Sequence, residues 1–117
     1  MEQAIRQWVH QLTKHRRDIL AIGYFGSYAR GDWGVGSDLD IVIIVKHAER
    51  PFTTRAAVWD TTDLPVPVDL VVYTLDEWQG MLRTSPWVRT IAREAVWVYG
   101  DTCALTADLS HAREDRP

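Results

Sequence analysis

The residues with the clearest chemical potential are Gly26 and Ser27, followed after ten intervening residues by Asp38 and Asp40. Gly26 ends an apolar stretch, and its missing side chain allows another group to approach the backbone. Ser27 would open a short helical turn, whose exposed N–H groups and nearby hydroxyl suit phosphate oxygens. Asp38 and Asp40 begin a second apolar stretch, so on a strand their carboxylates share one face with Cα atoms about 7 Å apart. That separation suits carboxylates that converge on two divalent metal ions.

A third acid, Asp69, interrupts an otherwise apolar, β-branched stretch at residues 67–74. If that strand lies beside the one that begins at Asp38, all three carboxylates meet at one end of the sheet. Two such charges about 4 Å apart repel by roughly 4 kcal/mol at an effective dielectric near 20, so the cluster favours bound cations. Magnesium or manganese suits carboxylate oxygens, and magnesium commonly adds substrate phosphates as ligands. The sequence therefore predicts a nucleoside triphosphate between Ser27 and the Asp38–Asp40 pair.

Each signal has a simpler interpretation when it is taken alone. A Gly26-Ser27 pair is a common end of a strand, and an isolated Asp69 on a strand more often faces water. The combination of turn, fixed gap and three acids favours a functional site over these separate explanations. Arg30 has two interpretations: it pairs with Asp32, or it contacts the triphosphate and so is a candidate nucleotide-binding residue.

Strands are predicted from aliphatic and aromatic runs at residues 19–25, 38–46, 67–74 and 96–99. The unbroken aliphatic run at 41–45 is typical of a central strand that is buried on both faces. The acids thus stand at the beginnings of two strands, and the Gly-Ser turn stands at the end of another.

Helices are predicted on either side of these strands. Apolar residues at helical spacing indicate an amphipathic helix over 2–14. A connecting segment is expected to contain one helical turn near 54–58. Thr74 and Glu77 match a capping box that begins a further helix, and Ser85-Pro86 begins another with proline in its first turn.

Composition limits the possible classes of protein. At 117 residues and 46% hydrophobic content, the chain is expected to form one domain over 1–117, with 101–117 a flexible or weakly helical tail. A net charge of -3 gives no general attraction for a polyanion, which argues against direct nucleic-acid binding. The single cysteine, Cys103, excludes an internal disulfide and is typical of a cytoplasmic protein. No apolar run approaches the length of about 18 residues that predicts a membrane span.

The segments GSYARG at 26–31 and GSDLDIVII at 36–44 resemble the signature of the DNA polymerase β-like nucleotidyltransferase superfamily. The short chain is most similar to the minimal nucleotidyltransferase (MNT) branch, and the resemblance extends over about residues 19–74. It implies an α/β (α+β) fold, with a mixed sheet of about four strands and helices packed mainly on one face. It also implies roles for five residues: Gly26 and Ser27 contact the triphosphate, Asp38 and Asp40 bind two divalent ions, and Asp69 completes the metal site and helps activate the acceptor hydroxyl.

The resemblance further implies a partner and a reaction. MNT proteins of this size resemble antitoxins whose partner is a small helical HEPN toxin, and such antitoxins transfer AMP from ATP to a toxin tyrosine. We therefore expect ATP as substrate, Mg²⁺ (or Mn²⁺) as cofactor, and a hetero-oligomer or homo-oligomer. Two alternatives stay open: an antitoxin that masks its toxin without catalysis, and a transferase that acts on a small-molecule hydroxyl such as that of an aminoglycoside.

The length of the chain independently suggests a partner. Val42, Ile44, Val71 and Tyr73 would share the face that carries the acids, and few elements are left to cover them. We therefore expect another protein to lie near that face.

Overall fold

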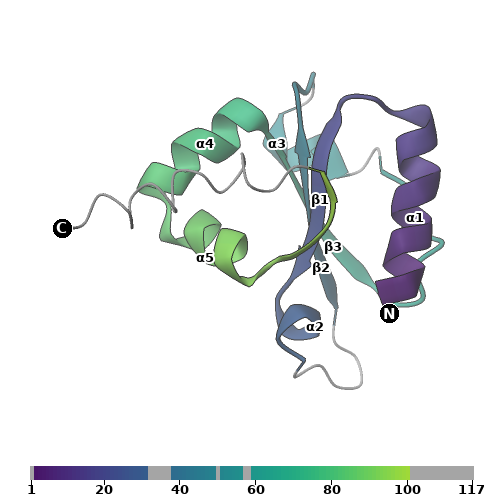
Figure 1. Cartoon of the computed structure of the whole chain (residues 1–117). Helices are drawn as coiled ribbons and strands as arrows, with labels where there is room; N and C mark the ends of the chain where they lie inside the picture. Colours follow the sequence, from purple (N-terminus) through teal and green to yellow (C-terminus); the bar gives the residue numbers. More distant parts are fainter. Residues whose placement is uncertain (1, 32–37, 50, 57–58, 101–117) are drawn as a thin grey trace.

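A mixed four-stranded sheet forms the centre of the computed structural model, which describes residues 2–31, 38–49, 51–56 and 59–100 (Figure 1). The strand order is β3-β2-β1-β4, with β1 antiparallel to both β2 and β4, and β2 parallel to β3. This confirms the predicted sheet. The strands are β1 (Ile19–Phe25), β2 (Leu39–Val45), β3 (Val68–Thr74) and β4 (Val96–Gly100).

The helices begin and end close to the positions predicted from sequence. The capping box is present, because Glu77 N donates to Thr74 Oγ1 at 3.2 Å and Thr74 N donates to Glu77 Oε1 at 2.9 Å. Ser85 caps the next helix, which has proline in its first turn. The single turn between β2 and β3 lies slightly earlier than predicted. The helices are α1 (Glu2–His15), α2 (Ser27–Arg30), α3 (Phe52–Arg55), α4 (Leu75–Thr84) and α5 (Pro86–Glu94).

Helices cover both faces of the sheet, with α1 on one side and α4 and α5 on the other (Figure 1). One core cluster joins α1 to Ile22 and Ile43, and a second joins α4 and α5 to Val42 and Ile44. The expectation that the helices pack mainly on one face is therefore wrong. The physical reason is that β1 and β2 are buried on both faces, so each face needs apolar cover.

The face that carries the acids is also covered, which corrects a second expectation. Val42, Ile44 and Tyr73 lie on that face, and they are buried beneath the apolar sides of α4 and α5. Val71 is partly buried in the same cluster. The chain therefore covers this part of the sheet with its own helices, and the face gives no argument for a partner.

Two other predictions concern membrane-spanning helices and the C-terminal tail. No helix among the described residues is long and apolar enough to cross a membrane. The predicted tail at 101–117, which includes Cys103, lies outside the described residues, as does Asp32.

Candidate functional site

The end of β1 and the beginnings of β2 and β3 meet at one edge of the sheet. Asp40 lies opposite Phe25 on β1 and in register with Asp69 on β3. Directly paired residues on adjacent strands point to the same face, so the Asp40 and Asp69 carboxylates are neighbours. Asp38 lies two residues before Asp40 and is exposed just outside the strand. The predicted alignment of the acid-bearing strands is therefore observed, whereas the roles of these residues in catalysis stay predictions.

Gly26 connects β1 to α2 directly beside Asp40. Its backbone adopts φ 77° and ψ -151°, a combination that glycine alone adopts readily. A Cβ atom built at this position would collide with the Asp40 carboxylate. Glycine is thus required here for both its backbone conformation and the room that it leaves, which agrees with the close approach predicted from sequence.

Ser27 begins the single turn of α2. Arg30 N donates to Gly26 O at 3.0 Å, and Gly31 N donates to Ser27 O at 2.9 Å. The first N–H groups of any helical turn have no acceptor within the helix, so they are available to a ligand or to other groups. Ser27 therefore begins a helical turn at the end of the sheet where the acid-bearing strands start (Figure 1), and its contact with phosphate stays a prediction.

Charge repulsion is concentrated on Asp40. Burial raises the pKa of the Asp40 carboxyl, and the neighbouring carboxylates of Asp69 and Asp38 raise that pKa further. Arg30 opposes the shift, while Glu94 adds to it. A cation bound at this edge would relieve the repulsion, and that is the electrostatic property expected of a metal site.

The donor set fits a metal that shares its ligands with a substrate. Among the described residues, no three His, Cys, Asp or Glu side chains are grouped closely enough to hold a metal ion by themselves. Magnesium in nucleotide enzymes is commonly bound by one or two carboxylates, with substrate phosphates and water completing its coordination. Asp40 and Asp69, in register on parallel strands, supply such a pair, and Asp38 is exposed beside them.

A fourth carboxylate, which sequence reasoning missed, lies at the same edge. Glu94 Oε1 accepts hydrogen bonds from Gly26 N at 2.6 Å and from Arg30 Nη1 at 2.9 Å. The predicted alternative partner of Arg30, Asp32, lies outside the described residues, and the observed ion pair is to Glu94. One signal was available in the sequence: an acidic residue at the C-terminal end of a helix opposes the helix dipole and so suggests another purpose.

An exposed aromatic side chain, Trp87, lies near this edge. Its exposed fraction is 56%, and its ring packs edge-on against Phe25 with centroids 5.9 Å apart. Phe25 immediately precedes Gly26 and pairs with Asp40 on β2, so the indole contacts the last residue of β1. Large apolar side chains that stay exposed at a site commonly contact a partner or a substrate.

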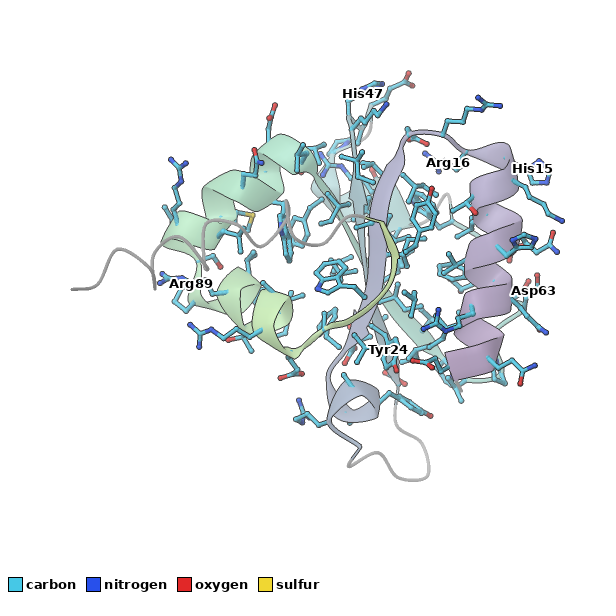
Figure 2. All side chains as sticks on the ribbon, viewed as in Figure 1. His15, Arg16, Tyr24, His47, Asp63 and Arg89 are labelled. Carbon is cyan, nitrogen blue, oxygen red and sulfur yellow. The ribbon has the colours of Figure 1, made fainter. Side chains whose placement is uncertain are left out.

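A cavity of about 400 Å³ lies at the opposite end of the sheet, where Arg16 and His47 line it. Figure 2 shows these two residues in the upper part of the view and Tyr24, next to Phe25, in the lower half. Arg16 forms an ion pair with Asp18 at 2.8 Å and stacks on Trp59, with its guanidinium carbon 4.0 Å from the ring centroid. These groups satisfy one another far from the acids, so we do not assign the cavity to the same site.

Similarity to known proteins agrees with this geometry. The sequence profile of the nucleotidyltransferase domain matches residues 5–97. A Methanocaldococcus jannaschii protein, provisionally named a protein adenylyltransferase, is 50% identical over 44 residues, which make up 37% of this chain and 44% of that relative. The match therefore spans less than half of the relative's length.

Solved structures show the same fold at low sequence identity. A toxin–antitoxin complex with AMP-PNP contains a chain with a TM-score of 0.58 and 19% identity, and the match covers 95% of this chain and 91% of that one. A complex of a tri-AMPylated Shewanella oneidensis HEPN toxin with its MNT antitoxin gives a TM-score of 0.54 and 18% identity, with 99% and 92% covered. A protein from Sulfolobus solfataricus, provisionally named a nucleotidyltransferase, gives a TM-score of 0.55 and 21% identity, and the match covers 81% of this chain and 76% of that one.

Proposed function

The chain belongs to the nucleotidyltransferase domain family, and from that membership we propose that it transfers AMP from ATP to a tyrosine hydroxyl of an HEPN toxin and thereby acts as an antitoxin. The observation that carries this proposal is the register of Asp40 with Asp69, next to the Gly26-Ser27 turn. A triphosphate seat and a carboxylate pair on one sheet edge are what phosphoryl-group chemistry requires.

Each residue has a distinct task in the proposed reaction. The Ser27 hydroxyl and the N–H groups at the start of α2 bind the β- and γ-phosphates and orient the nucleotide. Asp38, Asp40 and Asp69 hold the divalent ions, which when bound neutralise phosphate charge and lower the pKa of the acceptor hydroxyl. Asp69, which is exposed, faces the acceptor and helps to remove its proton.

The transfer itself is an in-line displacement. The acceptor oxygen forms a bond to the α-phosphorus of ATP, the bond from that phosphorus to the bridging oxygen breaks, and pyrophosphate leaves. The product is the AMP ester of the acceptor. A reaction of this kind depends mainly on positioning and on charge stabilisation, both of which the Asp40 edge is arranged to supply.

The choice of a protein acceptor is supported by two observations. The solved structures with this fold include an MNT antitoxin in complex with an HEPN toxin, and the toxin is tri-AMPylated. In this chain, the exposed indole of Trp87 stands beside Phe25 at the site and offers an apolar contact for an approaching protein. We propose that the protein acts in the cytoplasm, where ATP and the toxin would both be present.

The test is transfer of labelled AMP to an HEPN toxin expressed from the neighbouring reading frame. We expect the double variant Asp38→Asn with Asp40→Asn to abolish transfer while keeping the circular-dichroism spectrum of the folded protein. Undiminished transfer by that variant would contradict the assignment of the acids.

The same variant separates catalysis from masking. An antitoxin that works only by covering its toxin would still neutralise that toxin when it carries both substitutions. We expect the double variant to lose neutralisation as well as transfer. Label that appears on an aminoglycoside but not on the toxin would indicate a small-molecule acceptor.

A further inference from the structure

Glu94 connects two segments that are 68 residues apart in sequence. It is the last residue of α5, and one carboxylate oxygen accepts from both the Gly26 backbone N–H and the Arg30 guanidinium. The Glu94 side chain is only 22% exposed, whereas that of Arg30 is 50% exposed. These two hydrogen bonds therefore connect both ends of α2 to the C-terminal end of α5.

The location of Glu94 is unfavourable unless these two donors are present. The C-terminal end of a helix carries a partial negative charge, which disfavours a glutamate there. The acids at the same edge add to the repulsion, because Glu94 contributes to raising the pKa of the Asp40 carboxyl. Two charge-assisted hydrogen bonds offset these costs, and they also fix where the carboxylate points.

We infer that Glu94 is a positioning residue, which holds the Gly26-Ser27 turn and Arg30 in the orientation that nucleotidyl transfer needs. The inference rests on the proposed function for its substrate. It also corrects one detail of that function, because the Gly26 N–H is already used by Glu94. Gly26 would then serve by its shape, while Ser27 and the N–H groups that follow it would contact phosphate.

Two substitutions at the same position separate reach from charge. Glu94→Gln keeps the length of the side chain and an oxygen acceptor but removes the negative charge. Glu94→Asp keeps the charge but is one methylene shorter, so it reaches Gly26 and Arg30 poorly. Glu49, an exposed glutamate near the opposite end of the sheet, provides matched control variants, Glu49→Gln and Glu49→Asp.

A positioning role predicts that reach matters more than charge. We expect Glu94→Asp to lower kcat for AMP transfer by roughly 10- to 100-fold, the range seen when residues that orient the ligands of a metal site are lost. Glu94→Gln should retain most of the kcat of the unmodified protein, and both Glu49 variants should have the same kcat as that protein. Equal loss in Glu94→Gln and Glu94→Asp, or full activity in Glu94→Asp, would overturn the inference.

Two further measurements do not depend on AMP transfer. The amide proton of Gly26 should exchange with solvent faster in Glu94→Asp than in Glu94→Gln, as measured by NMR. The affinity for Mg·ATP should be lower in Glu94→Asp than in the unmodified protein. If Glu94→Asp binds Mg·ATP more tightly, Glu94 competes with the nucleotide, and the inference is overturned. If the unmodified protein transfers no AMP, the proposed function fails, while the exchange and affinity measurements still test Glu94.

Discussion

Substitution of Gly26 by alanine should cost stability, because it meets two obstacles at once. The backbone at Gly26 has φ 77° and ψ -151°, where a side chain costs roughly 1–3 kcal/mol. The new Cβ also collides with the Asp40 carboxylate, the flexible end of its side chain, and displacing that carboxylate adds about 1 kcal/mol. We therefore expect Gly26→Ala to lower the free energy of unfolding by about 3 kcal/mol.

Gly31 provides the matched control. It also has a positive φ, 82°, but nothing lies within 4 Å of a Cβ built there. Gly31→Ala should therefore cost only the backbone part, roughly 1–2 kcal/mol.

The assay is urea unfolding of the metal-free protein, in a double-mutant cycle with Asp40→Ala. Removing the Asp40 carboxylate should recover about 1 kcal/mol of the Gly26→Ala cost, whereas the cost of Gly31→Ala should not change. If the changes in the free energy of unfolding of Gly26→Ala and Asp40→Ala add up in the double variant to within about 0.5 kcal/mol, the carboxylate does not fill the space beside this glycine.

Two further substitutions test charges at opposite ends of the sheet. Asp40→Asn should stabilise the metal-free protein by about 1 kcal/mol, because a pair of partly exposed carboxylates about 5 Å apart repel by that amount near the water limit. The pKa of Asp40 is raised, so its destabilising effect is absent below the unfolded pKa of 3.8 and fully present above the folded pKa. The melting temperatures of Asp40→Asn and of the unmodified protein should therefore diverge as pH rises through this range. A constant difference between them would contradict the reasoning. Glu77→Gln should cost about 1.5 kcal/mol in urea unfolding, because Arg55, with a side chain only 9% exposed, loses a charged partner at 2.6 Å. Arg55 lowers the pKa of Glu77, so this contribution is present above the unfolded pKa of 4.5 and lost as pH falls through the folded pKa; an equal cost of Glu77→Gln at low and neutral pH would be inconsistent with the ion pair.

Local signals were sufficient to predict most of the fold. The aliphatic run at 41–45 predicted a strand buried on both faces, and β2 has that character. The capping box at Thr74 fixed the start of α4, because its hydrogen bonds involve residues only three apart. The alternation of side chains on strands predicted that Asp40 and Asp69 share a face if their strands are neighbours, and the two residues are paired in register.

Contacts between distant segments could not be predicted in the same way. The position of Glu94 depends on how α5 packs on the sheet, and the local signal for it is an acid at the C-terminal end of a helix. The cover of the second face by α4 and α5 was missed because amphipathic helices show which side is apolar but not which face they cover. Because α4 and α5 bury Val42 and Ile44, that face is not open to a partner.

The most direct test of nucleotidyl transfer compares two labelled forms of ATP. The chain is incubated with an HEPN toxin, Mg²⁺, and ATP that carries its label on either the α- or the γ-phosphate. We predict label on a toxin tyrosine from α-labelled ATP alone, with the γ-label released in pyrophosphate. Transfer of the γ-label, or no covalent label in a complex that still neutralises the toxin, would contradict it.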